Sequence, residues 1–151
     1  MLSLCSAEGL KAPRTKRDPA SGRPARILVV EDERHIARLL DFVLRKAGYE
    51  VAVSHSAEQA LIEIQNGEPD ALVLDLVLPG MTGLELLRTI RAIPYSFTCV
   101  VIVLSSNWFG EPDKTLIEVG ASAQCSKPIA PSTLLRKLSN LGVHPLVPAD
   151  V

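Results

Sequence analysis

Short apolar runs alternate with amphipathic stretches along most of this chain, from Arg26 to about Leu141. The runs are continuous and rich in β-branched residues, which is typical of strands buried on both faces of a sheet. They predict strands at residues 27–30, 51–53, 71–74, 100–104 and 123–125. Apolar positions at helical spacing follow each run and predict a helix after each strand. The alternation therefore predicts an α/β fold with a doubly wound, parallel five-stranded sheet and helices on both faces.

Local signals mark where several of these helices begin and end. Ser56 with Gln59, and Thr82 with Glu85, have the spacing of a capping box, in which two side chains satisfy free backbone amides at a helix start. Pro112 and Pro131 suit a first helical position. In the first predicted helix, residues 36, 40, 43 and 47 form the apolar side.

The predicted elements divide the chain into three parts. Residues 1–25 lack hydrophobic periodicity and are expected to be a disordered basic N-terminal extension; residues 26–142 form the domain, and residues 143–151 form a C-terminal tail. The charge is uneven, because residues 1–24 carry five basic and two acidic groups while the whole chain has a net charge of −1. The rest therefore carries −4, which speaks against direct binding of nucleic acid by the domain.

The composition favours a cytoplasmic protein with an aliphatic core. Hydrophobic residues make up 47% of the chain and aromatic residues only 4%. Cys5, Cys99 and Cys125 show neither pairing nor metal-ligand spacing, which fits a reducing compartment. No apolar stretch approaches the roughly 20 residues that a membrane span requires.

Polar residues stand directly after four of the predicted strands. Glu31 and Asp32 follow the first, Asp75 the third, Ser105 the fourth, and Lys127 comes soon after the fifth. Ligands of open parallel sheets bind at the carboxyl ends of the strands. We therefore expect these side chains to meet at one edge of the sheet.

This set of side chains indicates metal-assisted phosphoryl chemistry. Three clustered carboxylates repel one another unless a cation lies among them, and hard oxygen ligands favour Mg²⁺. A carboxylate held beside that ion can attack phosphorus and form an acyl phosphate. For Asp32 alone a second interpretation stays open, because an acidic residue at this position often caps the following helix.

Five motifs resemble those of response-regulator receiver domains of bacterial two-component signalling. They are Ile27-Leu28-Val29-Val30-Glu31-Asp32-Glu33, Leu74-Asp75-Leu76-Val77-Leu78-Pro79-Gly80-Met81-Thr82-Gly83, Val103-Leu104-Ser105-Ser106, Gly120-Ala121 and Ser126-Lys127-Pro128. The resemblance covers roughly three quarters of the chain, without a large insertion between motifs. It implies a flavodoxin-like (βα)5 fold.

The resemblance also implies a role for each matching residue. Asp75 matches the phospho-accepting aspartate; Glu31, Asp32, Asp75 and the backbone carbonyl of Val77 match the Mg²⁺ ligands. Ser105 matches the switch hydroxyl, and Lys127 matches the lysine that contacts the phosphoryl group together with Ser105.

One position departs from the family pattern. Receivers usually carry an aromatic ring three residues before the lysine, and here that switch position is Gln124. An amide cannot fill the apolar slot of a ring. We therefore hypothesise that the signal is read mainly near Ser105, where Trp108 and Phe109 follow, although simple packing explains these aromatics equally well.

The sequence thus predicts a stand-alone response regulator, phosphorylated by a histidine kinase or a phosphotransfer protein in a phosphorelay. It would signal by phosphorylation-dependent contact with a downstream protein, and a homodimer is compatible with the sequence. A constitutive interaction module that ignores phosphate is the alternative. An Mg²⁺-dependent phosphatase is disfavoured, because such enzymes usually place an acid two residues after the nucleophile, and here that residue is Val77. We therefore expect a phospho-acceptor that assists its own phosphorylation and dephosphorylation rather than an enzyme.

Overall fold

The computed structural model describes residues 22–92, 99–106 and 114–145. Its five strands form one parallel sheet in the order β2-β1-β3-β4-β5. The strands are β1 (Arg26–Val30), β2 (Glu50–Ser54), β3 (Ala71–Asp75), β4 (Val100–Ser105) and β5 (Ala123–Ser126). The helices are α2 (Arg34–Lys46), α3 (Ala57–Asn66), α4 (Gly83–Ala92), α5 (Lys114–Val119) and α6 (Pro131–Asn140). The predicted doubly wound α/β fold is confirmed.

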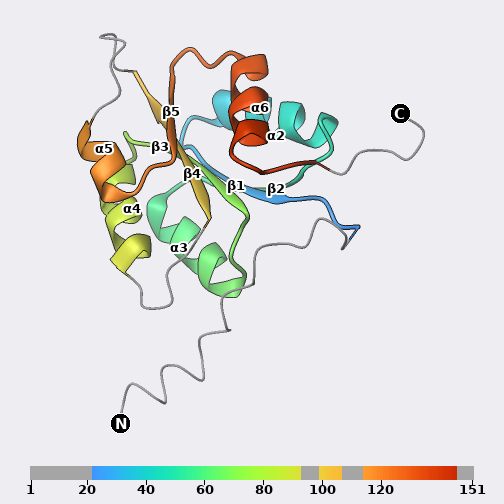
Figure 1. Cartoon of the computed structure of the whole chain (residues 1–151). Helices are drawn as coiled ribbons and strands as arrows, with labels where there is room; N and C mark the ends of the chain where they lie inside the picture. Colours follow the sequence, from blue (N-terminus) through green and yellow to red (C-terminus); the bar gives the residue numbers. More distant parts are fainter. Residues whose placement is uncertain (1–21, 93–98, 107–113, 146–151) are drawn as a thin grey trace.

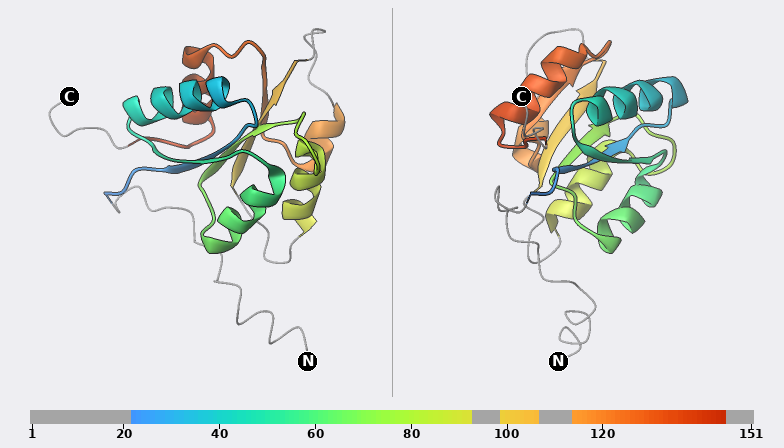
Figure 2. Two further views of the ribbon diagram at one scale, coloured as in Figure 1. Left: turned by 180° about the vertical axis from the view of Figure 1, so that it is seen from behind. Right: turned by 90° about the vertical axis from the view of Figure 1, so that its right-hand side faces the viewer.

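Helices cover both faces of the sheet. Figure 1 shows α2 and α6 on one face and α3, α4 and α5 on the other, and Figure 2 shows the same layers from two further sides. Each face has its own cluster of buried side chains, because alternate residues of every strand point to opposite sides. Among the buried hydrophobic residues described, Tyr49 is the one aromatic residue, so the core is aliphatic as predicted.

The predicted capping box at Thr82 forms in full, and at Ser56 the cap bond forms while the Gln59 side chain reaches the amide of His55 instead. The Gln59 amide donates to Ser56 Oγ (3.1 Å), and the Glu85 amide donates to Thr82 Oγ1 (3.1 Å). In return, the backbone amide of Thr82 donates to Glu85 Oε2 (3.2 Å). Both helix starts are therefore set locally by the sequence.

The structure does not support Asp32 as the cap of the first helix, α2. The N-cap residue of α2 is Glu33, and no side chain caps this helix start. The buried side of α2 is formed by Ala37, Leu40 and Leu44, so it is turned slightly from the predicted apolar side. Asp32 is thus left exposed at the end of β1, where it can serve the candidate site.

The packed core extends one residue beyond each predicted domain boundary. Ala25 is buried, and its carbonyl accepts a hydrogen bond from the Glu50 amide (3.0 Å). At the other end Val143 is buried, and its carbonyl accepts from the Tyr49 hydroxyl (2.7 Å). Within the described residues, no helix is long and apolar enough to cross a membrane.

Several sequence-based predictions lie outside the described residues. They concern most of the N-terminal extension, Cys5, Trp108, Phe109, the helix start at Pro112 and the tail from residue 146 onward.

Candidate functional site

The carboxyl ends of β1, β3 and β4 bring the predicted site residues to one edge of the sheet. Val30 pairs with Leu74 across β1 and β3, so Glu31 and Asp75 are the next residues of two neighbouring strands. Asp75 pairs in turn with Leu104, and Ser105 follows at the end of β4. The sheet register therefore aligns the strand ends, as the sequence predicts.

Three carboxylates lie together at this edge. Glu31, Asp32 and Asp75 each offer an oxygen within 4.8 Å of the oxygens of the other two. Glu31 is fully buried and Asp75 is 4% exposed, whereas Asp32 is open to solvent. The cluster is therefore buried on the protein side and accessible through Asp32.

Lys127 supplies a positive charge between the two buried carboxylates. Its Nζ donates to Asp75 Oδ2 (2.9 Å) and lies 3.2 Å from Glu31 Oε2. The main-chain amide of Lys127 donates to the Ser105 carbonyl (2.8 Å), and the peptide bond to Pro128 is cis. These links fix the lysine beside the acidic cluster.

The electrostatics show that one cation does not fully compensate these acids. Burial and the neighbouring carboxylate of Asp75 raise the pKa of Glu31 to about 7. Burial lowers the pKa of Lys127, but the hydrogen bond to Asp75 and the charges of Asp75 and Glu31 outweigh burial and raise it overall. The lysine is therefore charged at neutral pH, while the carboxylates still favour a further cation.

The chemistry of these donors fits a divalent metal ion. Glu31 Oε2 is buried and makes no hydrogen bond, although Lys127 Nζ is at ion-pair distance. Its other oxygen, Oε1, accepts from the amide of Glu33 (3.2 Å), which holds the carboxylate in place. A buried carboxylate oxygen beside two further carboxylates is a suitable ligand for a hard cation such as Mg²⁺. Glu31, Asp32 and Asp75 could therefore hold such an ion.

The loop after β3 folds back on Asp75. The Val77 amide donates to Asp75 Oδ1 (3.1 Å), so both oxygens of this carboxylate are held in place. The side chain of Val77 is 73% exposed beside the cluster. An apolar side chain at this position offers no group for proton transfer, which agrees with the disfavoured phosphatase interpretation.

Gly83 is a site residue whose role the sequence does not reveal. A Cβ at position 83 would collide with the Asp75 carbonyl and lie 2.8 Å from Leu76 Cα. The Gly83 amide also donates to the Leu76 carbonyl (3.1 Å). The start of α4 can therefore pack directly on the backbone of the acidic strand end. The sequence marked Gly83 only as part of a motif.

Ser105 and Gln124 lie on the neighbouring strands. Ser105 is buried at the end of β4, and Gln124 is half-buried in β5. Lys137 of α6 donates to the backbone carbonyl of Gln124 (2.6 Å). This contact ties β5 to α6, and it concerns the main chain rather than the amide side chain.

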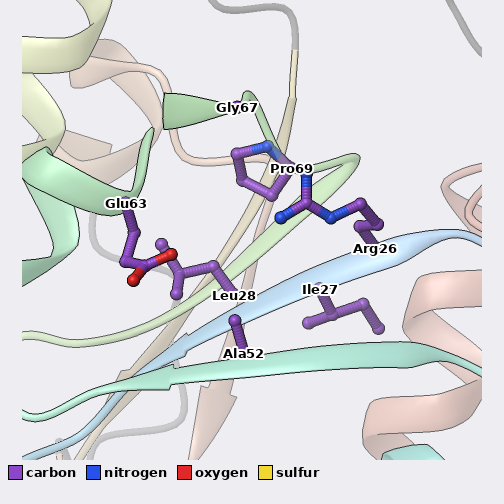
Figure 3. A pocket seen from close by; sticks show the side chains of 7 residues that line it. All are labelled: Arg26, Ile27, Leu28, Ala52, Glu63, Gly67 and Pro69. Carbon is purple, nitrogen blue, oxygen red and sulfur yellow. The ribbon is translucent and has the colours of Figure 1, made fainter. Parts of the chain in front are cut away.

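A hollow lies at the opposite end of the sheet and is separate from the cluster of carboxylates. It is a shallow, open hollow beside the first residues of β1 and the end of α3. Its lining residues are Arg26, Ile27, Leu28, Ala52, Glu63, Gly67 and Pro69 (Figure 3). Arg26 begins the strand that Glu31 follows, so this hollow does not contribute to the candidate site.

Comparison with known proteins identifies the family. The sequence profile of the response regulator receiver domain matches residues 27–139. A putative response regulator from Chloroflexus aurantiacus is 34% identical, with 79% of this chain and 98% of that chain covered and a TM-score of 0.70. The chemotaxis response regulator CheY4 of Vibrio cholerae is 29% identical over 78% of this chain and 98% of its own, with a TM-score of 0.73. A sensor protein from Polaromonas sp. is 33% identical over 77% and 94%, with a TM-score of 0.70. The chain therefore belongs to the receiver domains of two-component response regulators.

Proposed function

We propose that this receiver domain is a phosphorylation switch that takes a phosphoryl group on Asp75. The observation that carries the proposal is the position of Asp75: it is nearly buried, lies among two further carboxylates, and has an ammonium group 2.9 Å from Oδ2. A carboxylate beside a cation site and a lysine can accept a group that brings negative charge with it.

The donor is a phosphohistidine on a histidine kinase or a phosphotransfer protein. An oxygen of Asp75 forms a bond to phosphorus while the bond between phosphorus and the donor nitrogen breaks, and the histidine leaves with the electron pair. Lys127 lies where it can neutralise charge on the transferred group, and the Ser105 hydroxyl can donate to a phosphoryl oxygen.

The metal ligands in this proposal are Glu31, Asp32, Asp75 and the backbone carbonyl of Val77. When bound, Mg²⁺ would neutralise charge on the carboxylates and on the phosphoryl oxygens. Backbone amides orient two of these carboxylates before any ion binds, because the Glu33 amide donates to Glu31 and the Val77 amide donates to Asp75.

The output in this proposal is a contact with a downstream protein that depends on phosphorylation. The family usually couples the switch hydroxyl to an aromatic ring, and Gln124 replaces that ring here. We therefore assign the conformational response mainly to Ser105 and the chain that follows β4.

Labelling with a small phospho-donor tests the proposal. Incubation with radiolabelled acetyl phosphate and Mg²⁺ should label the wild-type protein and leave Asp75→Asn unlabelled. Asp41→Asn, which removes one carboxylate from the surface of α2, should label like the wild type. Equal labelling of Asp75→Asn would show that the acceptor is wrong, and a wild type that takes no label would favour a constitutive interaction module.

A further inference from the structure

The turn between β2 and α3 lies against the loop that carries Glu31 and Asp32 and against the loop that follows Asp75. On one side, His55 Nδ1 is 3.0 Å from the backbone carbonyl of Glu31. A carbonyl only accepts hydrogen bonds, so Nδ1 carries the proton in this contact. The bond crosses 24 residues of sequence and holds the main chain at the start of the β1–α2 loop.

On the other side, Glu58 in the first turn of α3 holds the β3–α4 loop. Its Oε1 accepts the backbone amide of Met81 (3.0 Å), across 23 residues of sequence. The hydrogen bond from Met81 lowers the pKa of Glu58, so the carboxylate is charged at neutral pH. The contact joins α3 to the loop that follows Asp75.

Gly80 makes the close approach of Glu58 feasible. Its φ of +73° lies in the left-handed region, which side chains rarely adopt. A Cβ at position 80 would also lie 2.9 Å from Glu58 Oε1. Glycine at position 80 therefore leaves room for the Glu58 carboxylate against the backbone of the loop.

The turn that bears both side chains is itself held by local hydrogen bonds. The backbone amide of Gln59 donates to Ser56 Oγ (3.1 Å). The side-chain oxygen of Gln59 accepts a hydrogen bond from the backbone amide of His55 (2.9 Å). These bonds fix the backbone of His55 and the first turn of α3, from which Glu58 extends.

We propose that His55 and Glu58 form a clamp that holds the β1–α2 and β3–α4 loops at the spacing needed for the metal and phosphoryl site. We call this pair the 55–58 clamp; both members are positioning residues. The inference rests on the proposed function, because it concerns the same carboxylates.

The clamp has a physical reason in the charge of the site. Three carboxylates lie within 4.8 Å of one another, and Lys127 offsets only part of their repulsion when no metal ion is bound. The remaining repulsion favours separation of the two loops. Hydrogen bonds from one rigid turn to the main chain of each loop oppose that separation. A site that is already in place binds its ion more tightly, because less order has to be created on binding.

Calorimetric titration with Mg²⁺ alone tests the clamp in the intact protein. We expect Glu58→Ala and His55→Ala each to weaken Mg²⁺ binding about three- to tenfold. Glu58→Gln keeps an oxygen that can accept the Met81 amide, and His55→Asn keeps a donor near Nδ1, so both should bind within about twofold of the wild type. Amide hydrogen exchange at Met81, followed by nuclear magnetic resonance, should become faster in Glu58→Ala and stay slow in Glu58→Gln.

Two control variants separate the clamp from general effects of charge and stability. Glu63→Ala removes the same charge from α3 outside the clamp, and His144→Ala removes an exposed histidine near the end of the described chain. Both should bind Mg²⁺ as the wild type does.

Wild-type affinity in both alanine variants of the clamp would overturn the inference and leave the proposed function intact. Equal losses in Glu58→Gln and Glu58→Ala, or a similar loss in Glu63→Ala, would also overturn it, because charge and not the hydrogen bond would then control affinity. A wild-type protein that binds no Mg²⁺ would contradict the proposed metal site, and the clamp with it.

Discussion

Asp75 and Gly83 touch through their backbones, and this contact leaves no room for a side chain at position 83. We predict that Gly83→Ala lowers the free energy of unfolding by about 2–3 kcal/mol, because either α4 or the end of β3 must move. Urea denaturation measures the change. Gly67→Ala is the control, since its Cβ would meet only the flexible end of Arg26 at 3.0 Å, and we expect a loss below about 1 kcal/mol. Equal losses in the two variants would contradict the special role of Gly83.

At the same scale, the sequence predicts which residues meet but not how they bond. Parallel strands end at one edge, so Glu31, Asp75 and Lys127 could be brought together by counting strands alone. The contact of His55 with the Glu31 carbonyl depends on the path of a loop and on one side-chain rotamer. Neither the path of a loop nor a side-chain rotamer leaves a pattern in the sequence. The 55–58 clamp therefore could not be predicted.

At the scale of elements, Arg91 joins three segments of the fold. Its Nη2 donates to the carbonyls of Gly120 (2.9 Å) and Cys99 (3.0 Å), and its Nε also reaches Gly120 (3.2 Å). The last turn of α4 is thereby tied to the residue before β4 and to the end of α5.

We predict that Arg91→Gln lowers the free energy of unfolding by about 1–3 kcal/mol, because the shorter amide leaves these partly buried carbonyls without their charged donor. Arg88→Gln, an exposed substitution on the same helix, should change it by less than about 0.5 kcal/mol. Thermal or urea unfolding of both variants measures the difference, and similar values would argue against Arg91 as a link between elements.

Element starts were predictable where their signals are local. The pairs Ser56–Gln59 and Thr82–Glu85 lie three residues apart, so the sequence alone identifies both helix starts. The start of α2 has no such pair, so the sequence left Asp32 open as a cap or a ligand, and the structure has Glu33 as the N-cap. A helix start that depends on hydrogen bonds between residues close in sequence can therefore be predicted. A helix start without such a pair can be located only in the folded structure.

At the scale of the molecule, the strand order explains why the site lies where it does. The chain passes from β1 to β2 on one side and then to β3 on the other side of β1. The helices α2 and α3 consequently cover opposite faces, as Figure 1 shows. Beyond the carboxyl end of β1, the connections diverge and leave the edge open where Glu31, Asp32 and Asp75 meet. The alternation of strands and helices predicts this arrangement, because right-handed crossovers allow few others.

The same arrangement links the site to the stability of the whole domain. Glu31 and Asp32 directly follow β1 and Asp75 ends β3, so an ion bound there links two neighbouring strands of the sheet. A ligand that binds only the folded state stabilises it by RT ln(1 + [L]/Kd), which is about 1.4 kcal/mol at ten times Kd. We predict that Mg²⁺ at this concentration raises the melting temperature by about 4 °C. Asp32→Asn should lose most of this shift, while Asp41→Asn should keep it. A shift that is the same in all three proteins would place the stabilising ion elsewhere and contradict the assignment of Asp32 as a ligand.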